Sequence, residues 1–269
     1  MKLFKMTLSM RQSPMIERFL SDIKVYDLSI TKGRLGNEGD GGYVVAMEHL
    51  ALANDLYSFG IGNDVGFELD FLRLFPKAKA HLFDPTIAKP PCRHERIGFE
   101  RRGIDSRVLY GGLPWGIELD SILKIDVEWA EWEALLEMPF NRLQFSQIII
   151  EFHILHLEAR SGLTPYFTGL YRSLVNRQND KLFHLYGDAM VWLNNWYRCF
   201  HIHVNNSLPM VKIGGYEFPP LLEMSFLRSD LAGNDIKPAS GPFPVPGLDF
   251  ANKKDRPDVV NWFPLIKDG

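Results

Sequence analysis

The chain has 269 residues, of which 46% are apolar and 23% charged, with 30 Lys and Arg against 33 Asp and Glu. These proportions are typical of a globular protein and exclude long disordered, collagen-like and coiled-coil chains. A formal net charge of −3 also argues against non-specific nucleic-acid binding, which requires a strong basic excess.

The sequence shows no feature of a membrane or secreted protein. Its apolar runs are shorter than the roughly 20 residues that a membrane-spanning helix needs. Residues 1–10 are followed by Arg11 and lack a small-residue cleavage site. The two cysteines, Cys92 and Cys199, form neither a disulfide framework nor a zinc ligand set. We therefore expect a cytoplasmic protein without membrane contacts.

The first elements expected along the chain are a helix and a turn-rich loop. Apolar residues at helical spacing follow Ser13 and Pro14, which predicts a helix within residues 13–26. The glycine-rich segment 34–43 then leads into a short strand at 43–47.

From residue 56 onward, expected strands alternate with expected helices. The strands are at 56–59, 80–83, 97–99, 121–125 and 147–152, and the helices between them at 64–75 and 130–138. This alternation predicts a parallel sheet covered on both faces.

The last third of the chain has a different pattern. Helices are expected at 164–177 and 181–194, and strands at 198–204 and 221–227, the last one antiparallel. Residues 233–269 contain six Pro and four Gly, so we expect an irregular tail that wraps on the domain or is partly loose.

Two loops at the expected carboxyl edge of the sheet point to a nucleoside ligand. Gly60-Ile61-Gly62 follows the first strand of the alternation, and glycines allow a ligand to approach the backbone. Asp84 follows the next strand, 22 residues after Gly62, a spacing that suits hydrogen bonding to a ribose diol. Each feature alone also fits a tight turn, and Val65 replaces the third glycine of G-x-G-x-x-G. Together they favour a nucleoside.

Acidic residues and a histidine follow the next two strands. Asp126 and Glu128 leave the sheet after the strand at 121–125, and Glu151 and His153 end the strand at 147–152. Glu151 follows three isoleucines, a costly position for an unpartnered carboxylate. These groups form either a catalytic cluster or a hydrogen-bonded network that shapes the loops, and we favour catalysis for Glu151 and His153. Surface positions are expected for Glu131, Glu133 and His156.

His203 reaches the same edge if its strand is parallel to the others. Imidazoles and carboxylates together suit Zn²⁺, Mn²⁺ or Fe²⁺ by ligand type. However, these groups come from separate elements without a recognised ligand spacing, so the sequence assigns no metal ligands and leaves a divalent metal as a minor alternative.

Several of these segments resemble class I S-adenosylmethionine-dependent methyltransferases. The similarity is carried by Phe-Gly-Ile-Gly at 59–62, Phe-Asp-Pro at 83–85, Leu-Lys-Ile-Asp-Val-Glu at 123–128 and Ile-Ile-Glu-Phe-His at 149–153. The chain is most similar to the FkbM-like and methyltransferase-domain-like group, which residues 39–43 and 222–226 also match. Trp129 replaces the glycine usual in this group, and we expect its indole to narrow the pocket or to pack against the adenine or acceptor.

The resemblance implies a Rossmann-like, doubly wound α/β fold. Its sheet is expected to be mostly parallel and seven-stranded, with an antiparallel last strand. The implied organisation is an N-terminal helical extension at 1–33, a methyltransferase domain at 34–232 and the tail at 233–269. The implied cofactor-binding residues are Tyr43, Gly60, Ile61, Gly62, Asp84, Ile104, Asp126 and Glu128.

The implied activity is S-adenosylmethionine-dependent O-methylation of a hydroxyl on a small molecule or sugar, with homodimerisation left open. Glu151 or His153 is expected to orient or deprotonate the acceptor, and His153 is the better base because an imidazole has a pKa of about 6.5. His203 is the second candidate base. The alternatives are a non-catalytic cofactor-binding or interaction protein and a nicotinamide-dependent oxidoreductase.

Overall fold

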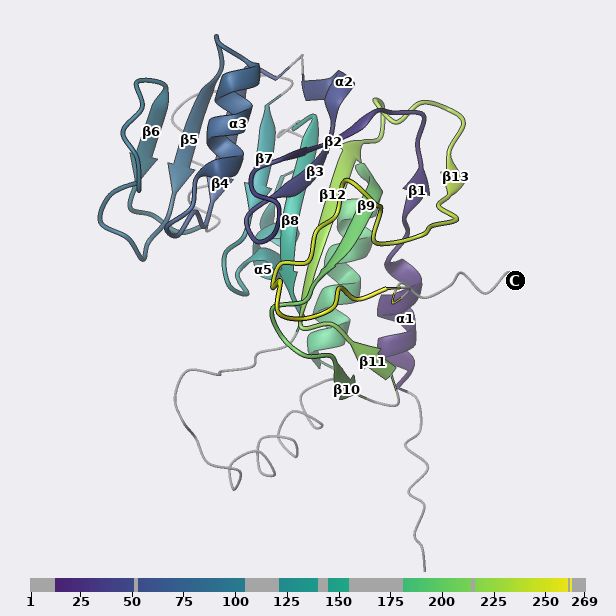
Figure 1. Ribbon diagram of the computed structural model, residues 1–269. Coiled ribbons are helices and arrows are strands. Elements are labelled where there is room, and N and C mark those ends of the chain that lie inside the picture. Colours follow the sequence, from purple (N-terminus) through teal and green to yellow (C-terminus); the bar gives the residue numbers. More distant parts are fainter. Residues whose placement is uncertain are drawn as a thin grey trace, which may run out of the picture.

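A computed structural model describes residues 13–50, 53–104, 121–139, 145–154, 181–213, 216–260 and 262. Its centre is a seven-stranded sheet in the order β6-β5-β4-β7-β8-β12-β9 (Figure 1). Five neighbouring strands run parallel: β6 (Ile97–Glu100), β5 (Lys79–Phe83), β4 (Asp55–Phe59), β7 (Ile122–Ile125) and β8 (Gln147–His153). The helix expected at 164–177 lies outside the described residues.

The last strand of the sheet in chain order lies inside the sheet. β12 (Leu221–Arg228) is antiparallel both to β8 and to β9 (Tyr197–Asn205), so β9 runs in the same direction as the parallel strands. The expected mostly parallel seven-stranded sheet with an antiparallel last strand is confirmed. The chain leaves β4 for β5 and β6 on one side and returns to β7 on the other, which places a topological switch point between β4 and β7.

Both faces of the sheet are covered (Figure 1). Successive residues of a strand point to opposite faces, so Ile122 belongs to one buried cluster and Leu123 and Ile125 to another. The first cluster includes Phe67 and Phe71 of α3 (Gly66–Leu74). The second cluster lies under α1 (Pro14–Asp22), α5 (Glu131–Glu137) and a helix over residues 181–194.

A short antiparallel ribbon lies beside α3, and a four-residue helix follows the ribbon. The ribbon consists of β2 (Lys32–Leu35) and β3 (Tyr43–Ala46), and α2 (Met47–Leu50) follows it. Two further strand pairs complete the described structure: β1 (Tyr26–Asp27) with β13 (Lys237–Pro238), and β10 (Val211–Ile213) with β11 (Tyr216–Phe218).

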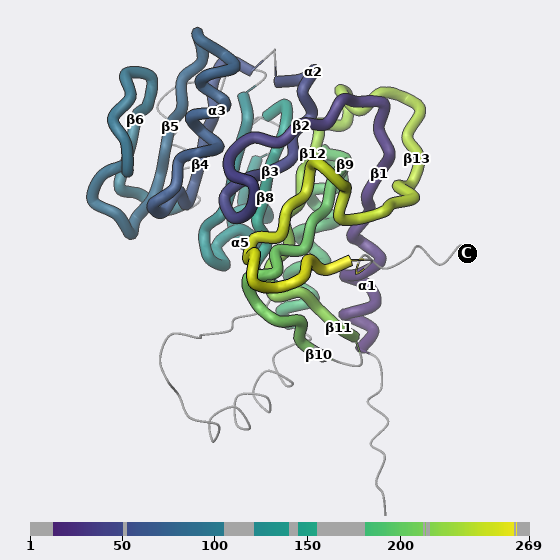
Figure 2. The backbone as a smooth tube through the Cα atoms, viewed as in Figure 1, coloured from purple at the N-terminus to yellow at the C-terminus, as the bar shows by residue number. Residues whose placement is uncertain are grey.

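The C-terminal tail is irregular and packs against β9 (Figure 2). Asp249 Oδ1 lies 2.8 Å from His201 Nε2, and the Asn206 amide donates hydrogen bonds to the carbonyls of Lys253 and Arg256. The tail is therefore attached to the sheet through side-chain contacts rather than strand pairing. Within the described part of the chain, no helix combines the length and apolar character needed to span a membrane.

Candidate functional site

The loop after β4 contains two glycines with left-handed backbone angles. Gly60 has a φ of 78° and Gly62 a φ of 51°. A Cβ on Gly60 would lie 1.6 Å from the Asp126 carbonyl oxygen, whereas a Cβ on Gly62 would meet nothing within 4 Å. Gly60 is thus required for the close approach of the loops after β4 and β7, and Gly62 borders open space.

Asp84 follows β5 and holds this loop in place. Its Oδ2 accepts a 2.8 Å hydrogen bond from the Gly62 N–H, and its Oδ1 accepts bonds of 2.7 and 2.6 Å from the Thr86 N–H and hydroxyl. Burial alone would raise the pKa of Asp84, but these hydrogen bonds lower it below its ordinary value. The carboxylate is therefore ionised, and its oxygens retain lone pairs for further donors.

A cavity of about 610 Å³ opens at the carboxyl ends of β4, β5 and β7. This volume lies within the range of small-molecule sites, about 300–1,000 Å³. The predicted cofactor residues that line it are Gly60, Ile61, Gly62, Asp84, Ile104, Asp126 and Glu128. Tyr43 contacts the lining instead, because its hydroxyl donates a 3.2 Å hydrogen bond to Asp126 Oδ2.

The wall of this cavity contains a buried ion pair that the sequence did not predict. Lys124 Nζ lies 3.6 Å from Glu68 Oε1, which also accepts a 2.6 Å hydrogen bond from the Ser58 hydroxyl. Burial lowers the pKa of Lys124, but Glu68 and further carboxylates raise it overall above its ordinary value. The one sequence signal was a lysine inside the apolar strand at 121–125.

Asp126, Glu151 and His153 converge beside the cavity. Each offers one ligand atom, and these atoms all lie within 4.8 Å of one another. Glu151 and His153 are buried and do not line the cavity, whereas Asp126 does, so Asp126 connects the two regions. The structure therefore brings together the acidic residue after β7 and the two candidate catalytic residues of β8.

The electrostatics of this group are dominated by burial and by excess negative charge. Burial raises the pKa of Glu151 well above its ordinary value, and the nearby carboxylates of Asp126 and Glu223 raise it further. Burial also raises the pKa of Asp126, although Lys124 opposes this shift. The ordinary consequence of such crowding is that the carboxylates share protons or require a cation.

Glu131 contradicts the expectation of a surface position. Its side chain is fully buried, and its Oε1 accepts hydrogen bonds from the His153 backbone N–H at 2.6 Å and from His153 Nδ1 at 3.1 Å. Its Oε2 accepts a 2.8 Å bond from the Trp129 N–H. The reason is that Glu131 begins α5 directly beneath the end of β8. Glu133 is exposed as expected, and His156 lies outside the described residues.

The hydrogen bonds of Glu131 also fix the state of His153. Because a carboxylate only accepts, Nδ1 of His153 carries the hydrogen, and Nε2 faces Glu128 Oε2 at 3.7 Å and Glu151 Oε1 at 4.0 Å. Burial lowers the pKa of His153, but Glu131 raises it by more, so the net shift is upward.

Trp129 has a φ of 97°, in the backbone region that favours glycine. Its indole packs against the core cluster under α5. It is absent from the described residues that line the cavity, so the indole does not narrow the pocket, and its packing against the adenine or acceptor stays a prediction.

His203 lies away from the cavity, between two carboxylates. Its Nδ1 is 2.9 Å from Glu223 Oε2, and its Nε2 is 3.3 Å from both oxygens of Asp258 in the tail. Burial lowers the pKa of His203, but Asp258 and Glu223 raise it to about 10. With both nitrogens occupied, the protonated ring joins β9, β12 and the tail.

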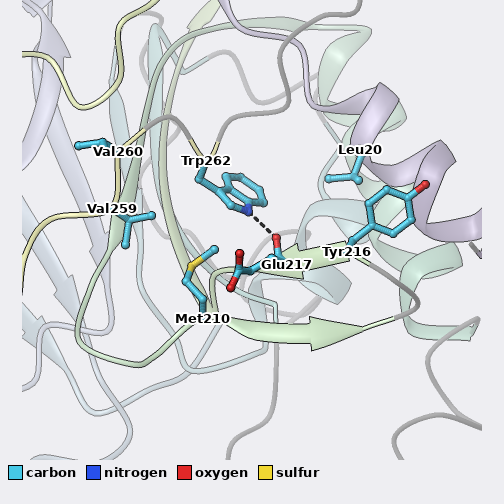
Figure 3. A pocket seen from close by; sticks show the side chains of 7 residues that line it. All are labelled: Leu20, Met210, Tyr216, Glu217, Val259, Val260 and Trp262. Carbon is cyan, nitrogen blue, oxygen red and sulfur yellow. Dashed lines mark hydrogen bonds between the residues drawn. The ribbon is translucent and has the colours of Figure 1, made fainter. Parts of the chain in front are cut away.

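A second cavity, of about 390 Å³, lies between α1, the β10–β11 hairpin and the end of the tail (Figure 3). Its lining is mostly apolar, and the Trp262 indole N–H donates a 2.6 Å hydrogen bond to the Glu217 carbonyl. No residue predicted to be catalytic or cofactor-binding lines it. The predicted cofactor residues thus gather at the larger cavity and not at this one.

No family model and no curated protein matches the chain. Among solved structures, it is similar to a Methanococcus jannaschii fibrillarin pre-rRNA processing protein (10% identity, 68% of each chain, TM-score 0.37). It is also similar to an O-methyltransferase family protein from Burkholderia thailandensis (12% identity, 67% of this chain and 52% of that one, TM-score 0.34). A third match is human N-acetylserotonin methyltransferase in complex with SAM (17% identity, 66% of this chain and 48% of that one, TM-score 0.33).

The aligned part spans about half the length of the Burkholderia and human chains. With every one of these TM-scores below 0.4, the similarities carry no argument about activity. Any assignment of function to this chain must therefore come from its own site.

Proposed function

We propose that this chain is an S-adenosylmethionine-dependent methyltransferase and that the larger cavity binds the cofactor. The observation that carries the proposal is the position and lining of this cavity. It opens beside the switch point between β4 and β7, where parallel sheets bind their ligands, and its wall is built from the motifs that resemble methyltransferases.

The wall provides a group for each part of the cofactor. Asp84, already ionised, accepts hydrogen bonds from the ribose hydroxyls, and Ile104 provides an apolar wall for the adenine. Gly60 and Gly62 pass beneath the methionine portion, where Gly62 leaves open space. Asp126 and Glu128 hold the cofactor amine or face the acceptor, and Tyr43 fixes Asp126. A nicotinamide dinucleotide is the weaker alternative because Val65 replaces the third glycine of the dinucleotide loop.

The acceptor we propose is a hydroxyl on a cytoplasmic small molecule or sugar, oriented or deprotonated by Glu151 or His153. In this reaction the hydroxyl proton moves to the base, and the oxygen attacks the methyl carbon of the sulfonium. The carbon–sulfur bond then breaks, which leaves a neutral thioether. The cofactor supplies the activated group, and the protein supplies alignment and the base. Nε2 of His153 is suited to act as the base because Glu131 already holds Nδ1.

Calorimetric titration tests the cofactor assignment. We expect S-adenosylmethionine and S-adenosylhomocysteine to bind and NAD⁺ not to bind. Asp84→Asn should weaken binding roughly 10-fold or more, because a charge-assisted hydrogen bond contributes about 1.5–3 kcal/mol. Glu133→Gln, on the exposed face of α5, is the matched control. Binding of NAD⁺ in preference to S-adenosylmethionine would overturn the proposal.

The catalytic assignment needs a separate measurement with a panel of hydroxylated acceptors. We expect His153→Ala to lower kcat by about 10²–10⁴-fold, the usual contribution of general acid–base catalysis. Its affinity for S-adenosylmethionine should be close to that of the wild type. Equal losses of kcat and cofactor affinity would reject the catalytic role. Cofactor binding without transfer to any acceptor would favour a non-catalytic binding protein.

A further inference from the structure

The group formed by Asp126, Glu151 and His153 has the composition of a metal site. Two carboxylates and one imidazole suit Mn²⁺, Fe²⁺ or Zn²⁺. On an ion with bonds of about 2.1 Å, ligand atoms lie about 3–4.2 Å apart. The three ligand atoms lie within 4.8 Å of one another, so side-chain shifts of about half an ångström close the group around an ion.

The side chains of Glu151 and His153 are largely buried and lie close together. Glu151 is 6% exposed and His153 is 5% exposed. Glu151 Oε1 and His153 Nε2 face each other at 4.0 Å, which is too far for a hydrogen bond. Within the described part of the chain, no donor or acceptor reaches either atom at bonding distance. His153 Nε2 also lies 3.7 Å from Glu128 Oε2, so this nitrogen faces carboxylate oxygens that would share a cation with it.

Each of the three residues also has a hydrogen bond to a residue outside the group. Glu131 Oε1 accepts from His153 Nδ1 at 3.1 Å, and the Asn205 amide donates to Glu151 Oε2 at 3.1 Å. The Tyr43 hydroxyl donates to Asp126 Oδ2 at 3.2 Å. A carboxylate behind a ligating histidine is the usual outer contact of metal sites, because it sets the tautomer and the ring orientation.

The local charge also favours a cation. Glu151 is surrounded by the carboxylates of Asp126, Glu223 and Asp40. Lys124 is already paired with Glu68 at 3.6 Å. A divalent ion would offset the two carboxylates that ligate it without requiring them to be protonated.

We propose that Asp126, Glu151 and His153 bind a divalent cation, with Glu131 as the outer carboxylate that orients His153. This inference rests on the proposed function and specifies how the acceptor is oriented. Three protein ligands leave coordination positions open for an acceptor hydroxyl, and Asp126 places them at the edge of the cofactor cavity. With an ion in place, Glu151 and His153 would orient the acceptor hydroxyl through the ion instead of taking its proton. The ion would lower the pKa of that hydroxyl, whose proton would leave to solvent, and the methyl transfer itself would be unchanged.

Titration of the chelator-treated full chain with Mn²⁺, followed by electron paramagnetic resonance, tests the site directly. The signal of free Mn²⁺ should fall as wild-type protein is added. Glu151→Gln and Asp126→Asn should each weaken Mn²⁺ binding at least about 10-fold, because even outer contacts of metal sites are worth 10–100-fold. Glu133→Gln serves as the matched carboxylate control, and circular dichroism checks that each variant is folded.

The outcome separates this inference from the proposed function. Asp84→Asn should weaken S-adenosylmethionine binding and leave Mn²⁺ binding unchanged, and Glu151→Gln should show the opposite pattern. If the wild type does not bind Mn²⁺, or if the ligand variants bind it as the wild type does, the metal site is wrong. Retained S-adenosylmethionine binding in that case would leave the methyltransferase proposal intact.

Discussion

Gly60 and Gly62 lie two residues apart in one loop but are required for different reasons. Both adopt positive φ angles, which cost a non-glycine residue about 1–2 kcal/mol. Only Gly60 faces another backbone, since a Cβ there would lie 1.6 Å from the Asp126 carbonyl oxygen. The first glycine therefore sets the packing of the strand ends, and the second preserves a turn and open space.

This difference predicts unequal effects of two matched substitutions. Gly62→Ala should lower the free energy of unfolding by about 1–2 kcal/mol, the cost of the left-handed backbone alone. Gly60→Ala should lower it by about 3 kcal/mol or more, because the clash adds to the same backbone cost. Urea denaturation measures both values. Equal losses for the two variants would contradict the assigned contacts.

At the scale of secondary structure, the Lys124–Glu68 pair joins β7 to α3. Both side chains are almost fully buried, and the ammonium lies 5.3 Å from the centroid of the Tyr43 ring. Removal of one member of a buried pair leaves the other charge without compensation, which costs more than removal of both. The pair thus fixes how a helix covers the sheet beside the cavity.

We expect Lys124→Met to lower the free energy of unfolding by about 3–5 kcal/mol, because the buried carboxylate of Glu68 would lose its cationic partner. The double variant Lys124→Met with Glu68→Gln should lose less than the single variant. A double-mutant cycle, again by urea denaturation, measures the coupling. Additive effects of the two substitutions would show that the pair does not act as a unit.

At the scale of the whole molecule, the tail is held to β9 and β12 through buried histidines. His203 lies between Glu223 of β12 and Asp258 of the tail, with its pKa raised to about 10 by these carboxylates against the effect of burial. An unfolded histidine has a pKa of about 6.5. The stability from this contact is therefore fully present below pH 6.5 and is lost as the pH rises through about 10.

This linkage predicts a pH-dependent difference between the wild type and His203→Gln. At neutral pH the variant should have a lower Tm, because the charged contact to the tail is removed. As the pH rises from 7 toward 10, the Tm of the wild type should fall more steeply than that of the variant. Scanning calorimetry over this range measures the difference. Parallel pH profiles of the two proteins would show that His203 does not hold the tail by its charge.

The order of strands and helices in the described core followed from local patterns. Alternating apolar segments predicted β4, β5, β6, β7 and β8, and the pattern at 221–227 together with the resemblance to methyltransferases predicted an antiparallel last strand. The sequence also predicted that Gly62, Asp84 and Asp126 meet at one edge, because the carboxyl ends of parallel strands lie at the same edge of a sheet. Local periodicity suffices for these features, since it depends on residues that are neighbours along the chain.

Which side chains are partners could not be read from those patterns. Glu131 looked like a surface residue, but it lies beneath the end of β8 and holds His153. His203 looked like a second base, but the insertion of β12 between β8 and β9 places Glu223 beside it, and the tail supplies Asp258. The sequence alone determined the sheet and the edge at which the candidate site lies. The tertiary structure decided which charges lie together there, because burial and pairing depend on contacts between residues far apart in the chain.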